Sequence, residues 1–188
     1  MASIGVFCAS SQRLEQRWLD LAHDLGVEIG RRGHELVSGG GCVGMMGALV
    51  DGAREGGART YGVIPQNLVD REVADTKSDE LVVTDGLASR KTLMIERADA
   101  FITLPGGLGT LDELFEVWTT ATLDLHRKPL LLFDVDGFYG GLLEWLRGLA
   151  RQEFVRASAM AMLLISGDVG ESLDLVEASL LGAAADRA

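Results

Sequence analysis

The chain has 188 residues, and 47% of them are hydrophobic, which is enough to bury the core of one domain. Its formal net charge of −11 at pH 7 argues against long nucleic acids and anionic membranes as partners, although backbone N–H groups can still gather a small anion. The two cysteines, Cys8 and Cys42, lack the spacing of a metal site or disulfide framework. No leader-like segment or apolar stretch of transmembrane length is present, so we expect a cytoplasmic protein.

Short apolar runs alternate with helix-length segments along the chain. In the first such segment, Leu14, Trp18, Leu21, Leu25 and Ile29 recur at helical spacing. In chain order, we expect strand 3–10, helix 12–32, strand 34–41, helix 43–57, strand 58–65, loop 66–79, strand 79–85, helix 89–99, strand 100–107, helix 108–124, strand 128–137, helix 138–152, strand 161–167 and helix 169–181. The alanine-rich tail from about residue 182 is expected to be flexible.

The expected strands are continuously apolar rather than alternating, which is typical of parallel strands that are covered on both faces. We find no internal repeat, low-complexity linker or domain boundary. The sequence therefore predicts a single α/β domain over residues 1–188, with a doubly wound parallel sheet and helices on both faces. Ligands of such sheets bind beyond the carboxyl ends of the strands, so functional residues are expected there.

Two of the expected strand ends are rich in glycine and lead directly into helices. They are SGGGCVGMMG at 38–47 and LPGGLGT at 104–110. Backbone N–H groups at the positive end of a helix suit a phosphate. One such loop is as easily explained by packing, but two in a small domain favour a phosphorylated ligand. The first expected strand lacks the dinucleotide fingerprint, and no Lys-Ser/Thr pair follows the first loop, which disfavours a P-loop nucleotide hydrolase.

Charged residues lie close to the second loop in the sequence. The apolar stripe of helix 108–124 leaves Glu113 and Glu116 off the buried face, within two turns of the loop. A solvated acidic face would explain either residue alone, but their place at the ligand edge favours a role in a site. Arg90 and Lys91 fall at the expected start of the preceding helix, where the helix dipole disfavours cations, so we expect an anion near them.

The segments SGGGCVGMMG, GVIPQNLVDRE, Arg90-Lys91 and LPGGLGTLDELFE occur in the same order and spacing as in the Lonely Guy family. The chain resembles that family from about residue 4 to residue 166. Its members resemble Rossmann-type folds and are cytokinin riboside 5′-monophosphate phosphoribohydrolases, many of them once labelled lysine decarboxylases. The resemblance implies hydrolysis of the N-glycosidic bond of cytokinin riboside 5′-monophosphates, and of AMP as a further substrate. It also implies a homodimer that needs neither metal nor cofactor.

By the same resemblance, Arg90 and Glu113 form the catalytic pair. The residues implied to bind the nucleotide are Gly39, Gly40, Gly41, Glu72, Lys91, Met94, Gly106, Gly107, Leu108, Gly109, Thr110, Glu116 and Thr119, with Met94 near the base. Cleavage develops positive charge on the sugar, which the Glu113 carboxylate can stabilise while it orients or deprotonates water. The pKa of Arg90 is too high for a general acid, so we expect it to donate fixed hydrogen bonds and to keep Glu113 ionised.

Some positions depart from the family pattern and leave alternatives open. Residues 86–89 read Gly-Leu-Ala-Ser where many members carry larger or polar side chains, and Leu108 stands where an aromatic residue is frequent. A general purine 5′-monophosphate nucleosidase and a non-catalytic nucleotide or cofactor carrier are the two rival functions. A decarboxylase is disfavoured, because no lysine falls in a convincing pyridoxal site. Asp134 and Asp136 fit either a metal pair or a strand-end turn.

Overall fold

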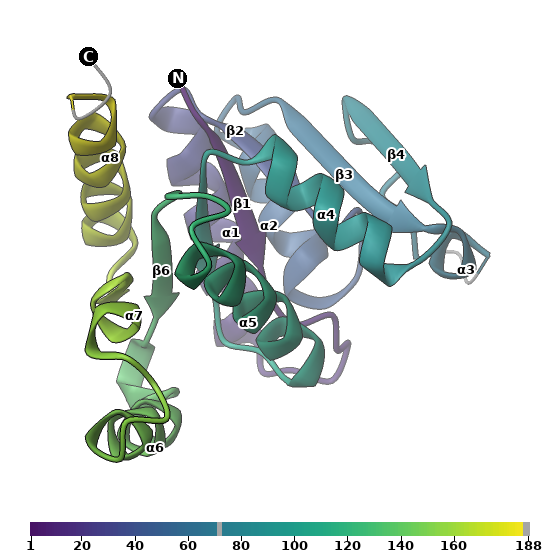
Figure 1. Ribbon diagram of the computed structural model, residues 1–188. Helices are drawn as coiled ribbons and strands as arrows, with labels where there is room; N and C mark the ends of the chain where they lie inside the picture. The colour runs from purple at the N-terminus through teal and green to yellow at the C-terminus, as the bar shows by residue number, and fades with distance from the viewer. Residues whose placement is uncertain (71–72, 186–188) are drawn as a thin grey trace.

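We describe a computed structural model of the chain, covering residues 1–70 and 73–185, with side chains up to residue 183 (Figure 1). Its strands are β1 (Ser3–Phe7), β2 (Glu35–Ser38), β3 (Thr60–Pro65), β4 (Glu80–Thr84), β5 (Ala100–Thr103), β6 (Leu130–Phe133) and β7 (Leu163–Ser166). Its helices are α1 (Gln16–Arg31), α2 (Gly44–Glu55), α3 (Gln66–Val69), α4 (Leu87–Arg97), α5 (Leu108–Thr122), α6 (Gly140–Arg151), α7 (Ala157–Ala161) and α8 (Val169–Ala185), with a 3-10 turn at Val135–Gly137.

The strands form one seven-stranded sheet in the order β4-β3-β2-β1-β5-β6-β7, and every strand pair is parallel. The central strands are buried along their whole length, whereas the edge strand β4 is partly exposed. The chain winds outward from β1 in one direction through β4, and then returns to β5 on the other side of β1. The strand order therefore reverses between β1 and β5, and this switch point is where doubly wound sheets open a crevice for ligands.

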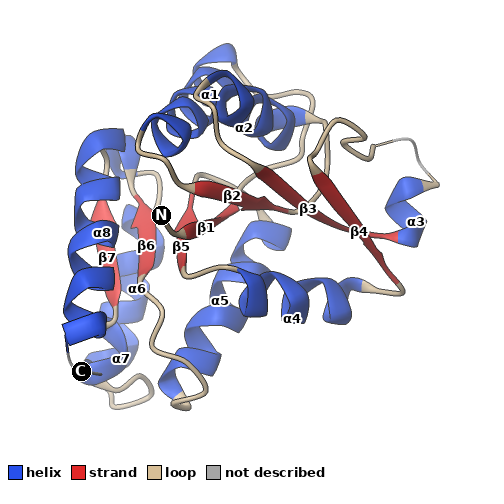
Figure 2. Cartoon of the chain, turned by 90° about the horizontal axis from the view of Figure 1, so that it is seen from above, coloured by secondary structure: helices blue, strands red, loops and turns tan. Residues whose placement is uncertain are grey.

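Helices cover both faces of the sheet, as the sequence predicted (Figure 2). One apolar cluster joins the sheet to α1, α2 and α8 through side chains such as Leu25, Leu49 and Val176. A second cluster on the opposite face joins it to α4, α5 and α6 through Met94, Leu114 and others. The two clusters hold the sheet between two helical layers, so its carboxyl edge becomes a rigid platform.

Helices α1 and α2 approach each other very closely at glycines. A Cβ built on Gly26 would lie 2.2 Å from the backbone oxygen of Leu49, and one built on Gly52 would lie 2.1 Å from that of His23. No real side chain tolerates such distances, so glycine is required at both positions by the packing of the two helices. The close approach fixes α2 against α1, and the first residues of α2 form the end of the first glycine loop.

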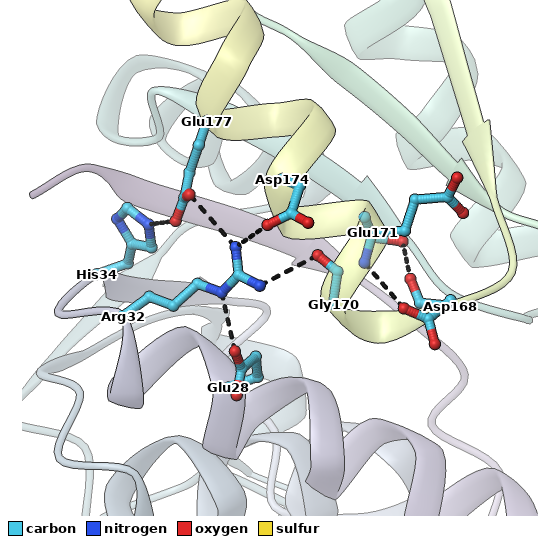
Figure 3. A network of polar contacts seen from close by, with 9 residues as sticks. Glu28, Arg32, His34, Asp168, Gly170, Glu171, Asp174 and Glu177 are labelled. Atoms are coloured by element: carbon cyan, nitrogen blue, oxygen red, sulfur yellow. Dashed lines mark hydrogen bonds and ion pairs between the residues drawn. The ribbon is translucent and has the colours of Figure 1, made fainter.

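A polar network ties the end of α1 to α8 (Figure 3). Arg32 donates to Glu28 on its own helix at 2.9 Å, to Asp174 at 2.6 Å and to Glu177 at 3.3 Å. His34 lies 2.8 Å from the same Glu177 carboxylate through its Nε2. These contacts join segments that lie more than 130 residues apart in the sequence, and they hold α8 against the layer of α1 and α2.

The structure differs from the sequence-based prediction mainly at element ends. Residues 66–69 form the short helix α3 where a loop was expected, and α7 was not predicted at all. The expected strand 128–137 is divided into β6 and the turn that contains Val135–Gly137. Helix α8 continues to Ala185, whereas the predicted helix ended at residue 181. Within the described residues, no helix is both long and apolar enough to span a membrane.

Candidate active site

Arg90 of α4 and Glu113 of α5 meet at the carboxyl edge of the sheet. Their side chains form an ion pair with 2.8 Å between Arg90 Nη1 and Glu113 Oε1, and both residues are only 8% exposed. Sequence reasoning predicted both residues for this edge, and the structure brings them into direct contact. A charge-assisted hydrogen bond of this length, shielded from water, fixes the orientation of the carboxylate.

The Arg90 guanidinium is also held by the backbone around it. Its Nε donates to the carbonyl of Val63 at 3.0 Å, and its Nη2 donates to that of Gly39 at 3.3 Å. The loop after β2 and the end of β3 therefore contact this single side chain. With one donor group on each carbonyl and one on Glu113, the guanidinium has a fixed place in the site.

The first glycine loop is shaped by this arginine. A Cβ on Gly39 would lie 1.8 Å from Arg90 Nη2, so any larger residue would displace the guanidinium. Gly40 has a φ of 71° and packs against the backbone of Val63, which explains glycine there as well. Gly41 pairs with Ala74 in an isolated antiparallel bridge. The loop was predicted to line a nucleotide, and the structure shows that Gly39 packs directly against the Arg90 guanidinium.

Burial has the largest effect on the pKa of Glu113. It raises the pKa of the Glu113 carboxyl above its usual range, while the Arg90 guanidinium acts in the predicted direction and lowers it. The neighbouring Asp112 carboxylate raises the same pKa further. Burial also raises the pKa of the Cys8 thiol at the end of β1, and Cys8 lies within range of the charges of Glu113 and Arg90. Cys8 is therefore a protonated, apolar neighbour of the pair.

The second glycine loop opens α5 and offers free space above its backbone. Gly107 occupies the N-cap position of α5, and no side chain accepts a hydrogen bond from the first-turn amides there. A Cβ on Gly107 or Gly109 would meet no atom within 4 Å, whereas one on Gly106 would lie 2.1 Å from the Thr110 hydroxyl oxygen. Gly106 is thus fixed against buried Thr110, and Leu108 beside it is 89% exposed. The uncapped start of α5 suits an anion, because its amides and the helix dipole both attract negative charge.

A largely apolar cavity of about 340 Å³ adjoins this loop at the switch point. It is lined by Ala9, Ser11, Leu14, Trp18, Met45, Pro105, Gly106, Gly107 and Phe138. Trp18 and Phe138 meet edge to face across it, with ring centroids 5.5 Å apart. The second glycine loop therefore lines this cavity and leads directly into α5, the helix that carries Glu113.

Lys91 and Glu116, both expected to bind the nucleotide, bind each other. Lys91 Nζ lies 2.8 Å from a Glu116 oxygen and 2.9 Å from an Asp112 oxygen. The hydrogen bonds that Lys91 donates to Glu116 and Asp112 raise its pKa, although partial burial acts in the opposite direction. The anion expected near the two cations is thus supplied by carboxylates of α5, because Arg90 and Lys91 lie in the second turn of α4 and face that helix.

Other predicted residues lie apart from the pair. Met94 is fully buried in the apolar cluster beneath α4, and Thr119 lines a separate groove with Trp118 and Phe154. Glu72 lies outside the described residues. Sequence reasoning missed Asp112, which is adjacent to Glu113 in the chain and was a visible candidate. It also missed Tyr139, for which the sequence carried no signal because its partner is a backbone carbonyl.

The fold and the site together place this protein in the class of Rossmann-like α/β proteins, with a buried Arg–Glu pair and an open helix start at the ligand edge. A family model described as "Possible lysine decarboxylase" matches residues 46–176. The chain is 46% identical over 171 residues to a cytokinin riboside 5′-monophosphate phosphoribohydrolase of Mycobacterium tuberculosis, with 91% of each chain covered. It is 38% identical to the Arabidopsis thaliana protein of that name, with 93% of this chain and 81% of the relative covered. The chain belongs to this family, the Lonely Guy family, as its motifs predicted.

Solved structures support the fold at lower sequence identity. The molybdenum cofactor carrier protein of Chlamydomonas reinhardtii matches with a TM-score of 0.73 at 23% identity, covering 96% of this chain and 98% of the other. A molybdenum cofactor binding protein of Rippkaea orientalis matches with a TM-score of 0.72, also at 23% identity, covering 94% of this chain and 96% of the other. At such identity the likeness concerns the fold alone, and it confirms the predicted doubly wound architecture.

Proposed function

We propose that this protein hydrolyses the N-glycosidic bond of cytokinin riboside 5′-monophosphates and releases the free base and ribose 5-phosphate. The observation that carries the proposal is the buried 2.8 Å pair of Arg90 and Glu113, one turn from an uncapped glycine-rich helix start. The name of the relatives at 46% and 38% identity supports the same reaction. A carboxylate beside an anion site is what cleavage of a phosphorylated nucleoside requires.

In this proposal the phosphate binds at the start of α5. The first-turn amides of the helix and the open space over Gly107 and Gly109 favour a dianion there. Binding energy from this remote group would hold the ribose over Glu113, which lies one turn further along the same helix. The rigid helix thus sets the distance between the phosphate and the reacting carbon.

Glu113 is the residue that faces the reacting sugar in this scheme. As the bond from C1′ to the base nitrogen breaks, its electron pair leaves with the base, and C1′ gains positive charge that the carboxylate stabilises. A water oxygen then bonds to C1′ and its proton passes to Glu113, while the base nitrogen takes up a proton from solvent. Arg90 donates to the carboxylate and holds it in place.

A substrate panel separates this function from its two rivals. Isopentenyladenosine monophosphate and AMP would each be incubated with the protein, and release of free base would be measured. We expect release from the prenylated nucleotide. Equal release from both would instead favour a general purine nucleosidase, and tight binding of nucleotide without release would favour a carrier. One structural neighbour is named a molybdenum cofactor carrier.

The lysines of this chain do not support the decarboxylase activity that the description of the family model suggests. The chain has three, at 77, 91 and 128. Lys91 is paired with two carboxylates, and Lys128 donates to the backbone oxygens of Ile95 and Glu96 at the end of α4. Lys77 lies near the buried Asp75, to which its own amide donates. None of these arrangements resembles a lysine poised to form a Schiff base with a cofactor.

The homodimer and the cytoplasmic location are also part of the proposal. Leu108, Leu123, Leu125 and Phe154 expose large apolar side chains, which are the kind of surface that a subunit interface buries. Sedimentation equilibrium would measure the assembly directly. A strictly monomeric protein at micromolar concentration would contradict the dimer without affecting the proposed chemistry.

A further inference from the structure

A buried tyrosine forms a hydrogen bond with the backbone at the start of the second glycine loop. Tyr139 is 3% exposed, and its hydroxyl donates to the carbonyl of Leu104 at 2.8 Å. The amide of Gly106 acts on the same phenol oxygen, and its hydrogen bond opposes the rise in the pKa of Tyr139 that burial causes. One hydroxyl thus contacts the backbone on both sides of Pro105, at the turn that leads into α5.

The tyrosine is itself anchored in the turn after β6. Its amide donates to Asp134 Oδ1 at 2.6 Å, and its carbonyl accepts from Leu143 in the first turn of α6. Asp134 in turn donates its own amide to the carbonyl of Ser166 at the end of β7. The sequence allowed Asp134 to belong either to a metal pair or to a strand-end turn. In the structure, its carboxylate accepts the Tyr139 amide and closes a turn at the end of β6.

We propose that Tyr139 is a positioning residue that holds the turn at Leu104, Pro105 and Gly106 in the shape that receives the substrate phosphate. The proposal rests on the proposed function for its ligand, but the contacts that carry it belong to the protein alone. Thr110 leaves no room for a side chain at Gly106, and the phenol donates to the Leu104 carbonyl on the other side of Pro105. In this proposal these contacts restrict the turn, so that the amides at the start of α5 keep their direction.

The substitution Tyr139→Phe tests the hydrogen bond separately from the packing, because phenylalanine fills the same space in the core. In Tyr139→Phe the carbonyl of Leu104 loses its partner inside a buried turn, and the turn gains freedom. We expect the KM for the nucleotide and the inhibition constant of ribose 5-phosphate each to rise about tenfold, while kcat changes less than about threefold. Inhibition by free adenine, which lacks a phosphate, should be unchanged.

The chain supplies a matched control in its other tyrosine. Tyr61 of β3 is also buried, packs in the same apolar cluster and lies under the Arg97 guanidinium, 5.1 Å from the ring centroid. Tyr61→Phe removes the same atom at the amino-terminal end of a strand, away from the loop. We expect it to leave both constants within twofold of the wild type. An equal rise in both variants would mean a general effect of lost stability and would overturn the positioning role.

Amide hydrogen exchange tests the same inference without a ligand. In Tyr139→Phe we expect exchange to quicken at residues 104–110 and to stay unchanged in β1 and β2. Unchanged exchange in that segment, or an unchanged inhibition constant for ribose 5-phosphate, would overturn the proposal. If the wild-type protein binds no phosphorylated ligand, the proposed function fails, and the exchange measurement still decides whether Tyr139 holds the turn.

Discussion

At the scale of single residues, the site is governed by the cost of burying one carboxylate beside one guanidinium. Glu113 is surrounded by protein, so its charge is worth more to a developing cation than it would be in water. Glutamine has the same shape and still offers an oxygen to Arg90, but it carries no charge. The amide therefore separates the electrostatic role of Glu113 from its part in packing.

We expect Glu113→Gln to lower kcat by at least about 100-fold and to change nucleotide affinity by less than about fivefold. Single-turnover release of base and equilibrium binding of the nucleotide would measure the two effects. Glu144→Gln is a suitable control, because the Glu144 side chain is 67% exposed on α6 and its one ion pair within the described residues is with Arg151. Turnover within tenfold of wild type in Glu113→Gln would remove Glu113 from its assigned role.

The raised pKa of Glu113 has a consequence for the pH dependence of the reaction. Activity needs the ionised carboxylate, so kcat/KM should fall as pH drops through the raised pKa, at a higher pH than an ordinary glutamate would give. Because the Asp112 charge contributes to the rise, Asp112→Asn should move this acidic limb to lower pH. Profiles of kcat/KM against pH for both proteins would test this. An unmoved limb would show that another group controls it.

The positions of Arg90 and Glu113 were predictable because chain position and chemistry agreed. Both residues fall in the helices that follow strand ends, where ligands of such sheets bind, and together their charges favoured a site over a solvated face. Met94, which was also predicted for the site, lies one turn after Arg90 on α4 and is fully buried in the core. Side-chain partners such as the Leu104 carbonyl of Tyr139 have no sequence pattern at all.

At the scale of elements, the contact between α1 and α2 depends on the absence of side chains. In Gly52→Ala the new methyl group would meet the His23 carbonyl of α1, so the helices must separate. We expect a loss of about 1–3 kcal/mol in the free energy of unfolding. Gly148→Ala in α6 is the matched control, because its Cβ would only touch the end of Arg151 at 3.7 Å. That variant should keep or slightly raise stability, since alanine favours a helix.

Urea unfolding followed by circular dichroism would compare the two variants. A Gly52→Ala protein as stable as Gly148→Ala would show that the helices can move apart without cost. The amide of Met45 at the start of α2 donates to the carbonyl of Ala9 after β1 at 3.0 Å, so a displacement of α2 would also strain this contact. Element packing and site geometry are therefore linked through this helix.

The strands and longer helices were all predicted from apolar spacing, but the short ones were not. Helices α3 and α7 have four and five residues, which is too short for a 3.6-residue period to be visible. The predicted strands extended too far, because no charged residue separates the glycines after β2, or Leu104 and Pro105 after β5, from the strand that precedes them. The order of the strands in the sheet could not be predicted either, because the alternation of strands and helices does not say on which side of β1 each strand lies.

At the scale of the whole molecule, the net charge opposes the ligand that the site is proposed to bind. The chain carries a formal charge of −11, and a nucleoside monophosphate is a dianion at neutral pH. Attraction must therefore come from nearby amides and the dipole of α5, which act over a few ångströms. The long-range field of the protein repels the substrate over the Debye length, about 10 Å at 0.1 M salt.

This opposition predicts an unusual response to salt. Added salt screens the long-range repulsion but has little effect on hydrogen bonds to backbone amides in direct contact, so kcat/KM should rise about two- to fivefold between 0.01 M and 0.15 M sodium chloride. A site that draws its phosphate mainly through lysine and arginine would show the opposite trend. Initial rates at substrate concentrations well below KM would measure it, with potassium acetate as a second salt to exclude competition by chloride. A fall in kcat/KM under both salts would mean that Arg90 and Lys91, rather than the open helix start, dominate capture of the phosphate.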